Sequence, residues 1–142
     1  MSELLRVADA VTSTLNAATL SLPFVAERHY QPVFDLAEMN DLHVTVVPKG
    51  VEVKEVARSK ATRDYTVDVA VQRKFEVGDA TELDPLMRLV EEIAEGFTFR
   101  RLADYPGAAW VKTEYVSIFA QEHMRELRQF TSVLTLTFRV VR

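Results

Sequence analysis

The nearest thing to a local chemical site in this sequence is a short run that contains Glu122, His123 and Glu126. In a helical turn the two glutamates would lie four residues apart on one side, with the imidazole of His123 beside them. Such a group could hold a metal ion or transfer a proton. Arg125 and Arg128 are interleaved with it, and mixed charges at this spacing are common on solvated helix surfaces. We therefore interpret the run as a solvated polar turn.

The other residues that could do chemistry are scattered along the chain. There is no cysteine, and the three histidines, at positions 29, 43 and 123, fall in three different expected elements. The four glycines are too far apart for a phosphate-binding loop, and no Gly-x-Ser-x-Gly elbow occurs. Asp79, Glu82 and Asp84 are explained as acids of a first helical turn, where the helix dipole favours them. We predict no catalytic residue, no cofactor and no metal site, and hence a protein that is not an enzyme.

Length and composition favour one globular domain over residues 1–142. Apolar residues make up 48% of the chain and charged residues 27%, which is ordinary globular composition. The net charge is −4, so the chain as a whole lacks the basic footprint of a protein that grips nucleic acid. No apolar stretch approaches the roughly 20 residues of a membrane span, and the N-terminus begins a helix pattern instead of a basic signal peptide. We expect no membrane partner.

Two amphipathic helices are predicted from apolar residues that recur at three and four positions. Ser2 can cap the first, which buries a stripe from Leu4 to Leu15 and ends near Ala17. The second runs from about Leu83 to Phe97, with Asp79 or Thr81 as its cap and with Pro85 in its first turn, where a proline is tolerated. Both stripes should pack on a sheet.

The predicted strands alternate apolar and polar residues at a period of two. A short strand is expected over 24–30, longer ones over 42–47 and 65–75, and two more over 110–119 and 129–141 after a turn at 105–107. The order helix, strand, strand, strand, helix, strand, strand predicts an α+β fold. We expect an antiparallel β-sheet with two helices packed on one face, and with long loops or hairpin arms.

The segment from Lys49 to Arg63 is the richest in basic residues, although Glu52 and Glu55 interrupt it and no aromatic residue is present to stack on a base. The pattern favours a solvated or subunit-contacting loop over a nucleic-acid site. It leaves open whether residues 51–64 extend two strands into a long hairpin arm or form a mobile loop. Because the segment contributes little core, its deletion (residues 51–63) should spare folding and impair assembly.

The last strand has one apolar face and a second face rich in threonine. Thr135, Thr137 and Arg139 belong to the second face, together with Val133 and Val141. A solvated outer face usually carries more charge than this. We expect the face to be exposed in the single chain and to meet another subunit or a helix.

Four segments together carry a resemblance to a known family. They are the strand that ends in proline (42–48), the alternating strand after the charged loop (65–71), the amphipathic helix (83–97) and the closing strand (130–139). With the capped N-terminal helix, they resemble the small tail-terminator, or tail-completion, and head–tail joining proteins of long-tailed bacteriophages and prophages. The resemblance extends over nearly the whole chain and contains no catalytic motif.

The resemblance implies a structural protein of the virion tail or neck, assembled in the host cytoplasm. Such proteins form a ring, commonly a hexamer, that caps the tail tube and presents a surface to the head connector and neck proteins. The implied partners are further copies of the chain, the major tail tube protein and those connector proteins, with DNA only passing through the lumen. The implied candidates for subunit and partner contacts are Lys49, Lys54, Arg58, Lys60, Arg63, Arg125, Arg128, Thr135, Thr137 and Arg139.

Three alternatives remain open from sequence. The chain could be another ring-forming neck or head–tail connector protein, or an adaptor in a secretion or contractile injection apparatus. In a different class, it could be a small enzyme or ligand-binding domain with a pocket between helices and sheet. The last alternative requires a cluster of buried polar side chains beneath the second helix, and the stripe from Leu83 to Phe97 offers none.

Overall fold

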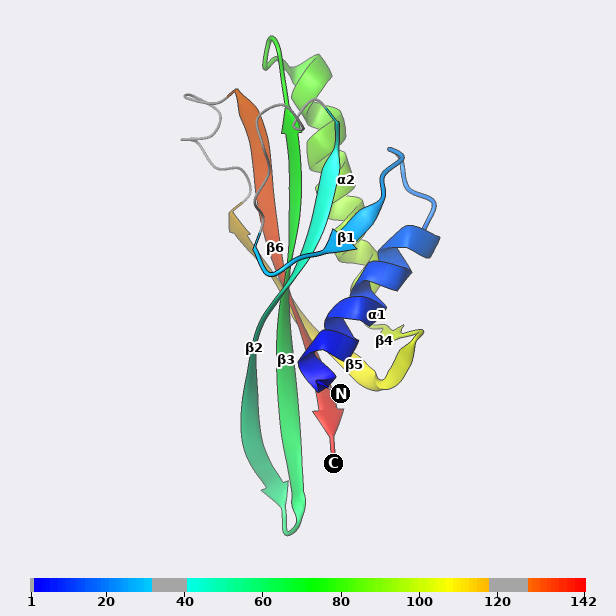
Figure 1. Ribbon diagram of the computed structural model, residues 1–142, viewed down its shortest axis with the longest axis vertical. Helices are drawn as coiled ribbons and strands as arrows, with labels where there is room; N and C mark the ends of the chain where they lie inside the picture. The colour runs from blue at the N-terminus through cyan, green and yellow to red at the C-terminus, as the bar shows by residue number, and fades with distance from the viewer. Residues whose placement is uncertain (1, 32–40, 118–127) are drawn as a thin grey trace.

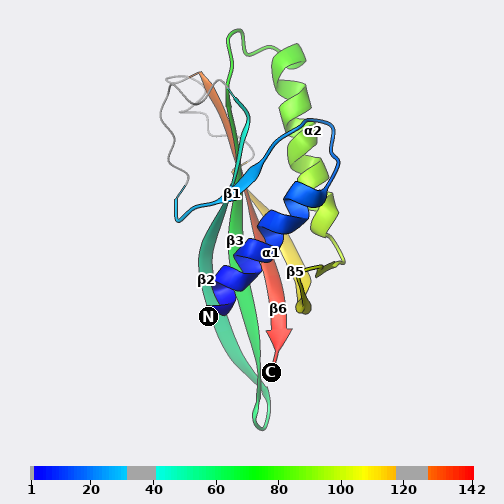
Figure 2. The same ribbon diagram turned by 45° about the vertical axis from the view of Figure 1, so that its right-hand side comes forward.

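The computed structural model describes residues 2–31, 41–117 and 128–142. It has two layers, in which helices α1 (Glu3–Ala17) and α2 (Ala80–Phe97) cover one face of a six-stranded sheet (Figures 1 and 2). The strands are β1 (Ala26–Arg28), β2 (His43–Ala57), β3 (Lys60–Lys74), β4 (Arg101–Leu102), β5 (Tyr105–Ser117) and β6 (Gln129–Val141). The α+β prediction is confirmed.

Both helices begin at side chains that satisfy free backbone N–H groups. The Ser2 hydroxyl accepts from the N–H of Leu5 at 3.3 Å, and the Asp79 carboxylate accepts from the N–H of Glu82 at 3.1 Å. Of the two caps that the sequence offered for α2, the structure therefore uses Asp79. Because α2 begins at Ala80, Pro85 lies in its second turn and not in the first, so the helix forgoes one backbone hydrogen bond.

The sheet order is β1-β2-β3-β6-β5-β4. All neighbours pair antiparallel except β1 and β2, which pair parallel over three residues. The expected antiparallel sheet is thus correct for the long strands, and the short β1 makes the sheet mixed. The turn expected at 105–107 lies two residues earlier, because Tyr105 already pairs with Leu102. Among the described residues, no helix is both long and apolar enough to cross a membrane.

The long strands β2 and β3 form a hairpin of 15 residues each. Pro48 does not end β2, because the strand continues past a register shift between Pro48 and Gly50. The far half of the hairpin projects beyond α1 and the C-terminus (Figure 1). We call residues 51–63 the arm. The structure therefore decides the alternative left open by the sequence in favour of a hairpin.

The core lies between the two helices and the apolar face of the sheet. Phe130, Leu134, Leu136 and Phe138 on β6 are all at most 1% exposed. They meet the inner stripes of α1 and α2, including Val11, Leu89 and Ile93. The ring of Phe138 meets that of Phe97 edge-on, with centroids 5.9 Å apart. Continuous burial along β6 makes this strand the centre of the fold.

Replacement of Phe138 by alanine is expected to lower the free energy of unfolding by about 3–5 kcal/mol, because it removes a fully buried ring and leaves a cavity. Phe99→Ala is a matched control of the same chemistry. The Phe99 side chain is 89% exposed, and its ring lies edge-to-face with that of Trp110 with centroids 5.2 Å apart, so its loss should cost less than about 1.5 kcal/mol. Urea unfolding of both variants measures the difference, and equal losses would contradict the assignment of the core.

Candidate functional site

Within the described residues, no three histidine, aspartate or glutamate side chains gather closely enough to hold a metal ion. His29 forms an exposed contact with Glu27 at 3.1 Å, and His43 is the first residue of β2. The run around Glu122, His123 and Glu126 lies outside the described residues, as does Arg125. The acids at the start of α2 have structural roles there.

Glu82 illustrates such a role. Its carboxylate accepts hydrogen bonds from the backbone N–H groups of Glu76, Val77 and Gly78, at 2.8, 2.8 and 2.9 Å. These bonds hold the pKa of Glu82 below its usual value. Gly78 itself has a positive φ of 77°, and a Cβ there would come within 2.7 Å of the Phe75 ring. The carboxylate therefore fixes the tight loop from which α2 begins.

A cleft with a volume of about 890 Å³ lies at this end of the molecule. Its lining includes the apolar residues Phe75 and Leu86 and the cations Arg73, Lys74 and Arg128. The Arg128 guanidinium donates to the backbone carbonyl of Glu76 at 3.2 Å. Beneath α2, the buried side chains of the described helix are all apolar. The described inner face of α2 therefore contributes no buried polar side chain to a ligand-binding or catalytic site.

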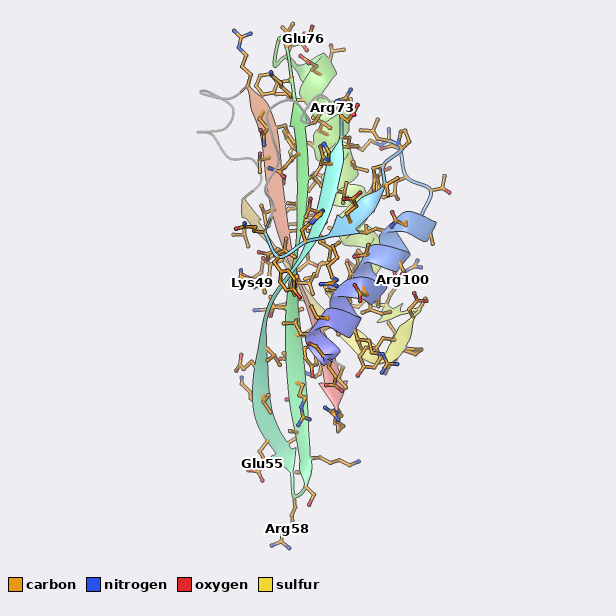
Figure 3. The ribbon with its side chains drawn as sticks, viewed as in Figure 1. Lys49, Glu55, Arg58, Arg73, Glu76 and Arg100 are labelled. Atoms are coloured by element: carbon orange, nitrogen blue, oxygen red, sulfur yellow. The ribbon has the colours of Figure 1, made fainter. Side chains whose placement is uncertain are left out.

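The arm is the most exposed part of the described chain. Every residue from 51 to 60 is exposed, including Val51, Val53 and Val56 at more than half of their surface. Glu55 and Arg58 lie toward the tip of the arm and point away from the rest of the protein, whereas Arg73 and Glu76 lie at the opposite end of the molecule (Figure 3). The segment from residue 49 to 63 contains five basic and two acidic residues, a net charge of +3. It is a basic, partly apolar ribbon held out in solvent.

The candidate cations of this segment differ in how they are bound. Lys49 lies 3.8 Å from the Asp68 carboxylate, Lys54 lies 3.0 Å from Glu52, and Arg63 donates to the carbonyl of Arg142 at 3.1 Å. Arg58 and Lys60 form no ion pair with any described residue. These two carry the charge that the arm has available for a partner.

The threonine face of β6 is less accessible than the sequence suggests. Thr135 and Thr137 are only 3% and 4% exposed, so the expectation of an exposed face is wrong for both. β6 is a central strand, and its neighbours β3 and β5 flank these side chains with Asp68, Thr66 and Glu114. The Thr135 hydroxyl donates to Asp68 at 2.7 Å. Alternation alone does not reveal burial by neighbouring strands.

Arg139, further along the same face, remains half exposed. Its guanidinium donates two hydrogen bonds to the Asp64 carboxylate, at 2.8 and 2.9 Å, which tie the end of β6 to the base of the arm. The hydrogen bond from Arg139 lowers the pKa of Asp64, and the positive charge of Arg139 adds to this. Arg139 therefore stabilises the base of the arm through its ion pair with Asp64.

The sheet also has two open edges. On one side, β2 pairs with β1 only at residues 44–46, so residues 47–57 have no strand partner on their outer edge within the described chain. On the other side, β4 pairs with β5 only at Tyr105 and Ala109, and residues 111–117 are likewise open among the described residues. Unpaired edges of this length are templates for pairing with another chain.

A cluster around Glu3 was not recognised in the sequence. The Glu3 carboxylate accepts from the hydroxyls of Tyr65 and Tyr105 and lies 3.0 Å from the Arg142 guanidinium. Burial, followed by the contact with Glu3, raises the pKa of Tyr65 to about 12. Four residues from the two ends and the middle of the chain thus fasten α1 to the sheet. No local signal pointed to it, since the nearest partner of Glu3 along the chain, Tyr65, lies 62 residues away.

Comparison with known proteins gives a match in fold but not in sequence. No protein family and no curated protein matches the chain. Among solved structures, it is similar to the sheath/tube terminator of PVC, an extracellular contractile injection system, in its extended state. The TM-score is 0.52 with 14% identity, over 97% of this chain. The chain corresponds to 56% of the length of that terminator.

Replacing Asp64 by asparagine should lower the free energy of unfolding at neutral pH by about 0.5–1 kcal/mol, because the pair with Arg139 is partly solvated. The folded-state pKa of Asp64 is lowered, so this stabilisation is present above the unfolded pKa and disappears as the pH falls through the folded value. The difference between the two proteins should therefore shrink below about pH 4. Urea unfolding at several pH values measures it, with Glu55→Gln on the exposed arm as control. A difference that does not change with pH would contradict the ion pair.

Proposed function

We propose that this chain is a structural subunit of a ring at the head-proximal end of a phage tail, where it caps the tail tube and joins it to the head connector. The observation that carries the proposal is the similarity in fold to a sheath/tube terminator over 97% of the chain. The sequence resemblance to tail-terminator proteins points to the same class independently.

The surfaces of the molecule support self-association. The open edges of β2 and β5 lie on opposite sides of the sheet, so contact between copies would join two different surfaces. Contacts of this head-to-tail kind generate rings when the rotation closes. A hexamer is the expected closed form by resemblance, with the major tail tube protein on one ring face and connector or neck proteins on the other.

The remaining parts of the proposal follow from the location in a tail. The protein would be assembled in the host cytoplasm and reside in the virion. Its net charge of −4 suits a ring through which DNA passes without being held. The contact roles of Lys49, Lys54, Arg58, Lys60, Arg63, Arg125, Arg128 and Arg139 are part of this proposal. Burial of Thr135 and Thr137 argues against a direct role for those two.

A second candidate is the equivalent subunit of a contractile injection apparatus. This candidate is favoured because the similar solved structure is a terminator from an extracellular contractile injection system. Genes for a capsid and portal beside this gene would support the phage tail, and a gene cluster without them would support the injection apparatus. An enzymatic role is less well supported, because the described inner face of α2 is apolar.

The capping role predicts a defined effect on tube assembly. When the purified chain is added to tube protein from the same gene cluster during polymerisation, tubes should become shorter as the ratio of chain to tube protein rises. Gold-labelled chain should bind at one tube end only, which electron microscopy can score. Unchanged tube lengths, or label along the tube walls, would count against a terminator and favour a different station in the neck. Bovine serum albumin at equal concentration controls for crowding.

A further inference from the structure

The tip of the arm, residues 56–60, is a hairpin without a third strand among the described residues, whereas residues 61–63 of β3 also pair with the end of β6. Residues 51–57 of β2 pair only with β3, and no helix covers this part of the hairpin within the described chain (Figure 1). Isolated hairpins are marginally stable in water at best. Three half-exposed valines, Val51, Val53 and Val56, add apolar surface that a partner would remove from water. A partner that covers the arm would bury this apolar surface.

A surface of complementary character lies at the opposite edge of the sheet. Near the open end of β5, Tyr115 and Val116 are 44% and 59% exposed. Glu91 and Glu95 are exposed carboxylates of α2, and burial, followed by their negative charges, raises the pKa of Tyr115. Neither glutamate forms an ion pair with a described residue. We call Glu91, Glu95, Tyr115 and Val116 the acidic patch.

The two surfaces match in charge as well as in apolar content. The segment of residues 49–63 carries a net charge of +3, whereas α2 carries five acidic residues and one basic residue, a net charge of −4. Each surface combines exposed apolar side chains with two charged side chains that form no ion pair with a described residue, Arg58 and Lys60 on the arm and Glu91 and Glu95 on the patch. Opposite potentials on the two sides of a contact favour association and select the correct partner.

We propose that the arm of one copy docks on the acidic patch of the next copy, with Arg58 and Lys60 facing Glu91 and Glu95, and with the valines against Tyr115 and Val116. In one chain β3 and β6 separate the arm edge from the patch edge, and the opposite charges of the two surfaces favour a second copy of this chain as the occupant. The absence of aromatic residues from residues 49–63 disfavours nucleic acid as the occupant. The inference rests on the proposed ring and names the contact that builds it.

A charge swap tests the contact directly. Arg58→Glu with Lys60→Glu, and separately Glu91→Lys with Glu95→Lys, should each weaken association at least tenfold, because like charges then face each other. Combining all four substitutions should restore association to within a few-fold of the natural chain. Sedimentation and light scattering at about 150 mM salt measure the assembled fraction. Arg73→Glu with Lys74→Glu makes the same change in charge at the opposite end of the molecule and should leave assembly intact.

The outcomes separate this contact from the ring itself. The contact would be overturned if rings persist in both double charge-reversal variants, or if the variant with all four substitutions associates no more strongly than either double variant. Both results would leave the proposed function standing. A natural chain that stays monomeric with and without tube protein would overturn both. Circular dichroism melts confirm that each variant is folded, which is expected because all six substituted side chains are exposed.

Cross-linking provides a second test that does not depend on charge. The chain has no cysteine, so engineered thiols react only with each other. A Val53→Cys/Val116→Cys variant should give a ladder of cross-linked oligomers on mild oxidation, because each copy then links its arm to the patch of the next. Val77→Cys/Val116→Cys is the control, since Val77 is 77% exposed at the far end of the molecule. Rings without a ladder, or equal ladders in both variants, would overturn the contact.

Discussion

The antiparallel pairing of β3 with β6 is the constraint on which the rest of this structure depends. Thirteen consecutive residue pairs join the two strands, from Thr62 with Val141 to Lys74 with Gln129. Such a long ladder presents a long apolar face, and both helices are required to cover it. α1 and α2 cover the described body of the sheet but not the end of the hairpin (Figure 2). The exposed arm is thus a consequence of a sheet that is longer than its helical layer.

Local patterns in the sequence predict the elements well, because each pattern reports a face that the helix or strand buries by itself. The period-two alternation of β6 places Phe130 to Val140 on the core face, and the stripe of α2 from Leu86 to Phe97 packs as expected. Ser2 and Asp79 cap their helices because short polar side chains satisfy free N–H groups. These features depend on residues only a few positions apart.

The features that the sequence could not predict depend on residues distant in the chain. Alternation identifies Thr135 as lying on the second face, but only the pairing of β6 between β3 and β5 buries it. The Glu3 cluster joins Tyr65, Tyr105 and Arg142, and its geometry exists only after the sheet has formed. Part of the arm likewise belongs to the sheet, since Thr62 and Arg63 pair with the end of β6. Removal of residues 51–63 would therefore shorten the central ladder as well as the arm.

We propose that copies of this chain close into a ring, because the described molecule exposes two unlike sheet edges and a basic arm that no helix covers. Native mass spectrometry of the purified chain, with negative-stain images of the same sample, tests this most directly. The account predicts a single closed oligomer, expected to be a hexamer, with a central opening. Only monomers across the micromolar range, also in the presence of tube protein, would contradict it.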